Sequence, residues 1–124
     1  MKFIQTDNAP AAIGPYSQAV VHDGLIYCSG QVALSPSGEW QRGTAAQEAR
    51  VALTNLTGVL EAAGSSLSAA LKVTVYLQDM ADFASVNEVY SEFFGDHRPA
   101  RACVQAAALP GNARVEIDCV AVVG

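Results

Sequence analysis

One stretch of this chain carries apolar side chains at helical spacing from position 46 to position 63, and Gly64 follows it. Thr44 is placed to cap the start of such a helix, and Gln47, three residues later, completes a capping box. A helix with one apolar stripe must bury that stripe against another element. The chain must therefore also provide an apolar surface on which this helix can pack.

A second helical stripe and several strand-like segments set the order of the remaining elements. Apolar residues recur at helical spacing from Phe83 to Phe94, and Gly95 ends that run. Strand patterns occur at 2–6, 17–21, 25–29 and 71–78, with two closing strands between 98 and 122. The order is β-β-β-α-β-α-β-β. Because both helices must cover apolar sheet surface, we predict an α+β fold with the two helices on one face.

The two closing strands are predicted to form a hairpin, because the turn-forming sequence 109–112 (Leu-Pro-Gly-Asn) joins them. A four-residue loop would place Arg101 and Glu116 on the same face of that hairpin. The two side chains would then lie about 13 Å apart along the strand. If both side chains act on one small ligand, we therefore expect one of them to come from a neighbouring chain, unless a bulge changes the register.

The final strand is apolar on both faces near its end. Val115, Ile117, Cys119 and Ala121 face one way, whereas Val120 and Val122 share the other face with Glu116 and Asp118. Charged residues make up only 15% of the chain, which is few for the surface of a small monomer. We expect the second face of the sheet to be covered by further copies of the chain.

Arg101 is the most informative single residue. It follows Pro99 at the start of a strand, and residues 102–109 carry no charge. A guanidinium cannot lose its charge and is costly to bury alone. If its neighbours are buried, Arg101 needs an anion from elsewhere, and a small carboxylate ligand fits. The alternative is an arginine that reaches solvent or pairs with an acid distant in the sequence.

Length and charge narrow the class of protein. A chain of 124 residues without linkers or repeats predicts one domain, 1–124. The net charge is −5, and the basic residues are scattered rather than gathered in a stripe. Because nucleic-acid binding relies on clustered positive charge, we expect no nucleic-acid partner.

The beginning of the chain and its cysteines indicate a location. The first residues contain no signal-peptide pattern, and no run of apolar residues is long enough to span a membrane. Cys28, Cys103 and Cys119 are odd in number and far apart in sequence, so neither a disulfide framework nor a metal site is indicated. We expect a cytoplasmic protein with no membrane association.

Four segments, in order along the whole chain, resemble the signatures of the Rid (YjgF) family. They are 8–18 (Asn-Ala-Pro-Ala-Ala-Ile-Gly-Pro-Tyr-Ser-Gln), 29–31 (Ser-Gly-Gln), 83–90 (Phe-Ala-Ser-Val-Asn-Glu-Val-Tyr) and 99–104 (Pro-Ala-Arg-Ala-Cys-Val). The resemblance implies a chorismate-mutase-like sheet, a homotrimer and sites in the clefts between subunits. It also implies hydrolysis of 2-imino or enamine acids, such as 2-iminobutanoate and 2-iminopropanoate, to 2-oxo acids and ammonia, without metal or cofactor.

The resemblance also assigns roles to individual residues. Arg101 matches the arginine that binds the substrate carboxylate, and its planar fork suits two carboxylate oxygens. Glu116 matches the acid near the attacking water, where it can hold the water and move its proton. The remaining matches line the pocket: Tyr16, Ser29, Asn87 and the backbone of Cys103.

The alternative for each of these residues is a structural role. Tyr16 would pack a loop, and Ser29 would satisfy a strand end. Asn87 would cap a neighbouring loop, and Glu116 would be a solvated strand residue. Cys103, two residues from Arg101, suggests a nucleophile, but no histidine lies close in sequence to activate it. We therefore interpret Cys103 as a small wall of the pocket.

Two other functions remain open. Some members of the family carry the label endoribonuclease, but an acidic chain with scattered basic residues argues against RNA binding. A non-catalytic protein that binds a small carboxylate is the second alternative, although such relatives tend to lack the arginine that Arg101 represents. The segment 95–99 is shorter than in some relatives, and 106–108 is a run of three alanines. Both features leave the preferred imine open.

Overall fold

The computed structural model describes all 124 residues. One six-stranded sheet runs in the order β1-β2-β3-β6-β4-β5. All neighbouring strands are antiparallel except β4 and β5, which are parallel. The strands are β1 (Lys2–Ile4), β2 (Ala19–His22), β3 (Leu25–Gln31), β4 (Ala70–Leu77), β5 (Ala100–Gln105) and β6 (Val115–Val122).

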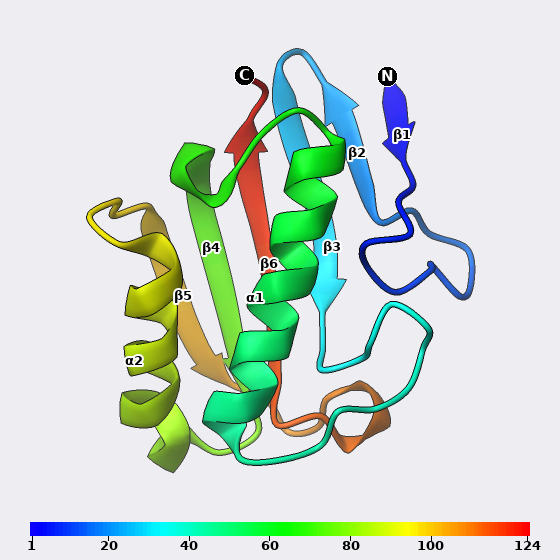
Figure 1. Cartoon of the computed structure of the whole chain (residues 1–124). Coiled ribbons are helices and arrows are strands. Elements are labelled where there is room, and N and C mark those ends of the chain that lie inside the picture. The colour runs from blue at the N-terminus through cyan, green and yellow to red at the C-terminus, as the bar shows by residue number, and fades with distance from the viewer.

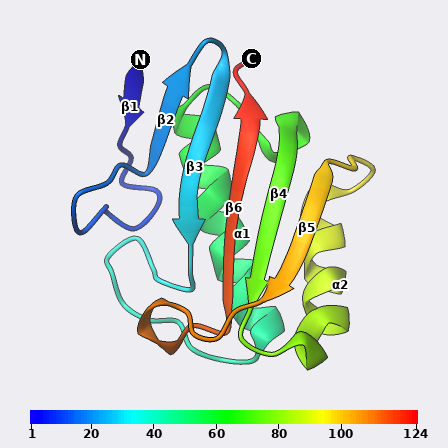
Figure 2. The ribbon, with the colours of Figure 1, turned by 180° about the vertical axis from the view of Figure 1, so that it is seen from behind.

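Two helices, α1 (Ala45–Ala62) and α2 (Phe83–Phe94), lie side by side on one face of the sheet (Figure 1). Seen from behind, the sheet has no helix in front of it (Figure 2). The predicted α+β architecture and element order are therefore confirmed. Short 3₁₀ turns add Leu67–Ala69, Met80–Asp82 and Pro110–Asn112.

The start of α1 is fixed by the capping box that the sequence predicts. The Thr44 side chain accepts a hydrogen bond from the Gln47 backbone N–H, and the Gln47 side chain accepts one from the Thr44 N–H at 2.8 Å. The apolar stripe of α1 then packs on the sheet, with Leu53, Leu56 and Leu60 fully buried. Each large aliphatic side chain buried in this way contributes about 1.5–3 kcal/mol of transfer free energy.

The predicted hairpin between the last two strands is wrong. The strand β5 pairs with β4 in parallel, and β6 inserts between β3 and β4. The crossover from β4 through α2 returns the chain to the edge of the sheet, where β5 becomes the last strand (Figure 1). The turn sequence 109–112 exists, but it lies in the connection 106–114 that carries the chain from the edge strand to the centre of the sheet.

The two faces of the sheet differ sharply in cover. On the helix side, the odd-numbered residues of β6 from Val115 to Ala121 are buried in one core with α1 and α2. On the side without helices, hereafter the open face, several apolar residues remain exposed. Tyr27 on β3 is 49% exposed and Val104 on β5 is 43% exposed. On the open face of β6 itself, Val120 is half-buried and Val122 is 38% exposed, so β6 is apolar on both faces and the helices cover only one of them.

No helix in the structure is long and apolar enough to cross a membrane. All three cysteines are free thiols. Cys28 and Cys119, far apart in sequence, are direct cross-strand neighbours on β3 and β6. No cluster of three or more histidine, cysteine or acidic side chains is arranged to hold a metal ion.

Candidate functional site

Arg101 lies on the edge strand β5, and its side chain reaches back over α2. Its guanidinium carbon sits 4.8 Å from the ring centre of Tyr90 and 5.6 Å from that of Phe83. Its Nη1 donates a hydrogen bond to Asn87 Oδ1 at 2.7 Å. No carboxylate lies within ion-pair distance of Arg101. The expected buried surroundings are not found, because β5 has a neighbour on one side only and Arg101 is exposed.

A cavity of about 420 Å³ opens beside Arg101 between α2 and β5. No acidic side chain lines it; its lining is Asn87, Tyr90, Ser91, Phe94, His97, Arg98, Pro99 and Arg101. Arg98 is tied to backbone carbonyls, among them that of His97 at 3.1 Å. In a protein whose net charge is −5, a cavity with two arginines and no acid is suited to an anion.

Cys103 lies two residues from Arg101 on the same face of β5 and is half-buried. Burial raises the pKa of its thiol, an effect that the nearby Arg101 charge only partly opposes. A raised pKa keeps the sulfur protonated, and no histidine hydrogen-bonds to it. This favours a small packing residue over a nucleophile for Cys103, which lines a narrow space next to Arg101 and not the 420 Å³ cavity itself.

Glu116 lies on the open face of β6, in contact with a bulge in β3. The register between β3 and β6 shifts between Cys28 and Gln31, so Ser29 and Gly30 together lie opposite Asp118. A Cβ atom at Gly30 would lie 2.1 Å from Glu116 Oε2, so the carboxyl group occupies the space that a side chain would fill. Sequence reasoning missed this role of Gly30, although a glycine within a strand is a signal for a close approach of this kind.

Two other side chains of the open face surround Glu116. Asp118 follows two residues later on β6, and Tyr76 on β4 is the direct cross-strand partner of Glu116. Burial raises the pKa of the Glu116 carboxyl, and the negative charge of Asp118 raises it further. A carboxyl group whose pKa is raised keeps its proton to higher pH than an ordinary glutamate does.

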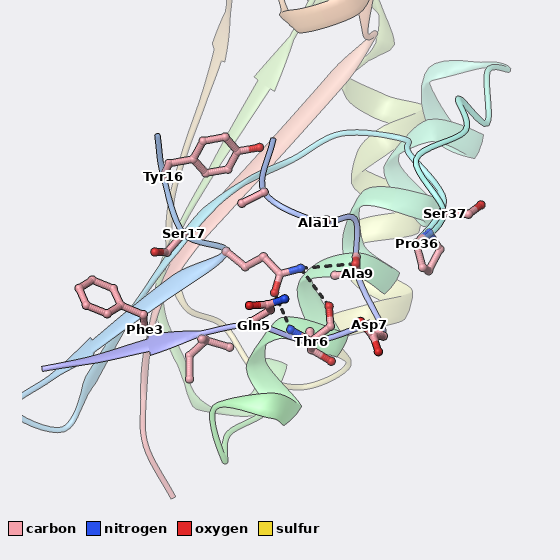
Figure 3. A pocket seen from close by; sticks show the side chains of 13 residues that line it. Phe3, Gln5, Thr6, Asp7, Ala9, Ala11, Tyr16, Ser17, Pro36 and Ser37 are labelled. Carbon is pink, nitrogen blue, oxygen red and sulfur yellow. Dashed lines mark hydrogen bonds between the residues drawn. The ribbon is translucent and has the colours of Figure 1, made fainter. Parts of the chain in front are cut away.

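Tyr16 and Ser29 come together through the loop that precedes β2. Ser29 Oγ donates a hydrogen bond to the carbonyl oxygen of Ser17 at 2.5 Å, and Tyr16 next to it is 55% exposed. The same loop borders a cavity of about 640 Å³, with Tyr16 and Phe3 on one side and Pro36 on the other (Figure 3).

The buried side chain of Gln18 holds this loop in place. Its Nε2 donates to the carbonyl oxygens of Thr6 and Pro10, at 3.1 and 2.8 Å, and its Oε1 accepts from the Thr6 N–H at 2.7 Å. These three bonds tie the start of the loop to the residue that leads into β2. The position of Tyr16 is therefore defined by the fold, even though its ring is exposed.

The structure divides the predicted site residues into two groups. Arg101, Asn87 and Cys103 lie at the α2–β5 edge on the helix side, whereas Tyr16, Ser29 and Glu116 gather around the β3 bulge. The expectation that Arg101 and Glu116 share one face is wrong, because it rested on the hairpin. In the observed register Arg101 pairs with Val73 and Glu116 with Tyr76, residues of opposite parity on β4.

Comparison with known proteins decides the family. The sequence model described as endoribonuclease L-PSP matches residues 6–123. The chain belongs to this family. The *Escherichia coli* YjgF gene product, after which the Rid (YjgF) resemblance is named, is 43% identical, and the two structures superpose with a TM-score of 0.93 over 98% of each chain. The predicted family is therefore confirmed.

Among the relatives of this L-PSP family member are proteins with a named activity. It is 53% identical to the 2-iminobutanoate/2-iminopropanoate deaminase of *Mus musculus*, over 99% of this chain and 92% of that protein. The protein of the same name from *Bos taurus* is 52% identical, over 99% and 90%. A structure of *E. coli* TdcF with bound serine superposes with a TM-score of 0.94 at 41% identity, covering both chains completely.

Proposed function

We propose that this protein hydrolyses reactive 2-imino acids, of the 2-iminobutanoate and 2-iminopropanoate type, to 2-oxo acids and ammonia. The observation that carries the proposal is Arg101, an arginine without a carboxylate partner beside an acid-free cavity. A planar guanidinium binds a carboxylate through two parallel hydrogen bonds, and every 2-imino acid has such a carboxylate next to its C=N group. Relatives about 50% identical over nearly the whole chain carry the name of this activity.

We propose further that the working site lies between two subunits of a homotrimer. Arg101 and Glu116 are offset by about 10 Å along the strands and about 10 Å across them, on opposite faces of the sheet. The two groups of site residues cannot meet within one chain. If the β5 edge of one copy, where Arg101 lies, packs on the open face of the next copy, it covers exposed apolar residues there such as Tyr27 and brings that copy's Glu116 to the Arg101 cavity.

In this site Arg101 holds the substrate carboxylate, and Asn87 fixes the guanidinium through its hydrogen bond. The C=N carbon is thereby held where a water molecule can reach it. Glu116 of the neighbouring copy orients that water and transfers protons. Tyr16 and Ser29, from the same copy as Glu116, line the far side of the cleft, and Cys103 closes its floor.

The reaction needs only these groups. The water oxygen forms a bond to the imine carbon, and the electron pair of the C=N π bond moves to nitrogen, which takes a proton. Loss of a proton from the added water gives a carbinolamine. The C–N bond then breaks as the hydroxyl proton passes to nitrogen, and the products are a 2-oxo acid and ammonia. Because imines already hydrolyse in water, a modest reduction of the barrier suffices.

RNA cleavage is the function that the family description suggests. The net charge of −5 and the carboxyl groups of Glu116 and Asp118 on the open face disfavour binding of a polyanion such as RNA. A small anionic substrate needs only the local positive charge of Arg98 and Arg101. The three free thiols fit a reducing compartment, and we propose the cytoplasm.

The test generates 2-iminobutanoate in place and measures competition for it. An L-amino acid oxidase produces the imine from 2-aminobutanoate, and semicarbazide traps whatever has not been hydrolysed. Addition of the protein should lower the yield of semicarbazone, whereas Arg101→Ala should not. A protein that leaves semicarbazone formation unchanged but binds 2-oxobutanoate would be a binding protein rather than an enzyme.

A further inference from the structure

A second carboxyl group, that of Asp118, lies beside Glu116 and has no part in the mechanism described above. Asp118 lies two residues along β6 on the same open face, which places the two Cα atoms about 7 Å apart. Both side chains are half-buried within this single chain. Two carboxyl groups this close do not ionise independently, so the surroundings decide which of them keeps a proton.

The contacts of the two carboxyl groups differ. Tyr76 is the direct cross-strand partner of Glu116, but its hydroxyl is directed diagonally and donates to Asp118 Oδ2 at 3.2 Å. The side chain of Glu116 receives no hydrogen bond and instead fills the space beside Gly30. A hydrogen bond to a carboxylate stabilises its charged form. Asp118 is therefore the better anion of the pair.

The other groups around the pair also favour a charged Asp118 and a protonated Glu116. Burial raises the pKa of Asp118, and Tyr76, the Thr74 hydroxyl and the charge of Lys72 all oppose that rise. For Glu116, burial and the charge of Asp118 both raise the pKa, and nothing opposes them. Gly30, facing from β3, and Val104, in the same cross-strand row on β5, contribute no charge.

We propose that Asp118 is a positioning residue for the reaction: held as a carboxylate by Tyr76, it makes Glu116 the group of the pair that carries the proton and gives it to the departing nitrogen. This inference rests on the proposed function. In the first step Glu116 protonates the imine nitrogen as water adds to carbon, and its carboxylate then takes a proton from the added water. In the second step the same carboxyl group moves the hydroxyl proton to the amino group, which leaves as ammonia.

The decisive measurement uses no substrate. The carboxyl carbons of Glu116 and Asp118 are followed by NMR during a pH titration of the whole protein, with Glu116→Gln and Asp118→Asn assigning the signals. In Asp118→Asn the pKa of Glu116 should fall by about one unit, which is the size expected for a unit charge at this separation near a protein surface. Asp23→Asn, which removes a charge from the exposed β2–β3 turn, should leave the pKa of Glu116 unchanged.

Tyr76→Phe provides a second variant should Asp118→Asn fail to fold. It removes one hydroxyl group, and Asp118 should then titrate at higher pH. An unchanged pKa of Glu116 in Asp118→Asn, or of Asp118 in Tyr76→Phe, would overturn the inference.

The kinetic consequence is tested separately. If Glu116 acts in its protonated form, kcat/KM falls as pH rises through the pKa of Glu116 in the free enzyme. Asp118→Asn should move this fall to lower pH by the same shift. Relative to the wild type, kcat/KM should then be about tenfold lower at pH values above the pKa of Glu116 and unchanged at pH values well below it. A loss of equal size at every pH would indicate a purely structural role. If the NMR shift is found but no imine is hydrolysed, the proposed function fails while the coupling of the pair stands.

Discussion

Arg101 and Glu116 lie on opposite faces of the same sheet, Arg101 on the edge strand β5 and Glu116 on β6, with β4 between the two strands. Arg101 shares its cross-strand row with Val73, and Glu116 shares its row with Tyr76. No side-chain rotation can bring a guanidinium and a carboxyl group together through a sheet. If both act on one substrate, the second must come from another molecule.

Removal of Arg101 should abolish imine hydrolysis without unfolding the protein. Arg101→Ala loses the carboxylate grip, and Arg101→Lys should also lose most activity, because an ammonium group cannot form the paired hydrogen bonds. Activity is measured by semicarbazide competition and folding by circular dichroism. Arg50→Ala is the matched control, since it removes an exposed arginine whose pairing with Glu92 contributes about 0–1 kcal/mol. Near-normal turnover by Arg101→Ala would refute the assigned role.

Mixed assemblies should recover activity that each variant lacks. Arg101→Ala and Glu116→Ala are each expected to be inactive. When the two are unfolded together and reassembled, some clefts receive an intact Arg101 from one chain and an intact Glu116 from the next. Recovery should depend on the ratio of the two chains and be absent when they are refolded separately and mixed without exchange. A mixture that stays inactive after proven exchange would place both residues in a site of one chain.

The protein should be a trimer in solution. Light scattering should give a mass of about three times the 12.9 kDa of one chain. Val104→Asp places a charge on the exposed apolar part of the open face and should shift the mass towards that of the monomer. A wild-type mass near 12.9 kDa at micromolar concentration would contradict the trimer and, with it, the shared site.

Gly30→Ala should reduce activity far more than stability. The added methyl group would meet the end of the Glu116 side chain, which is flexible and can move aside, so folding is nearly preserved while the carboxyl group is displaced. We expect at least about a tenfold loss of kcat, on the scale of a misplaced general acid.

Gly43→Ala is the matched control for Gly30→Ala. Its methyl group would displace the Gln47 amide in the same manner, but at the start of α1 and away from the site. It should lower the melting temperature through loss of the cap and leave kcat unchanged. Equal effects of the two substitutions on kcat would show that Gly30 has no particular relation to the site.

Local patterns in the sequence were sufficient to predict the helices, because their signals lie within one or two turns. The stripe from Ala46 to Ala63 and the Thr44–Gln47 capping box depend only on neighbours three or four residues away. The motif around Arg101 likewise indicated an arginine without a local acid, and the structure shows no distant acid at ion-pair distance either.

Which strands pair, and which face each side chain occupies, depends on contacts between distant segments. The turn at 109–112 is a genuine local signal, but it carries no information about whether β6 pairs with the strand before it or enters the sheet two places away. Side chains alternate between the two faces with a period of two, so a pairing that is wrong by an odd number of residues assigns a side chain to the opposite face, as the predicted hairpin did for Arg101 relative to Glu116. The positions of Glu116 beside Gly30 and of Asp118 beside Tyr76 follow from the observed register and bulge. These are contacts between segments far apart in the chain, so the short-range patterns of the sequence do not contain them.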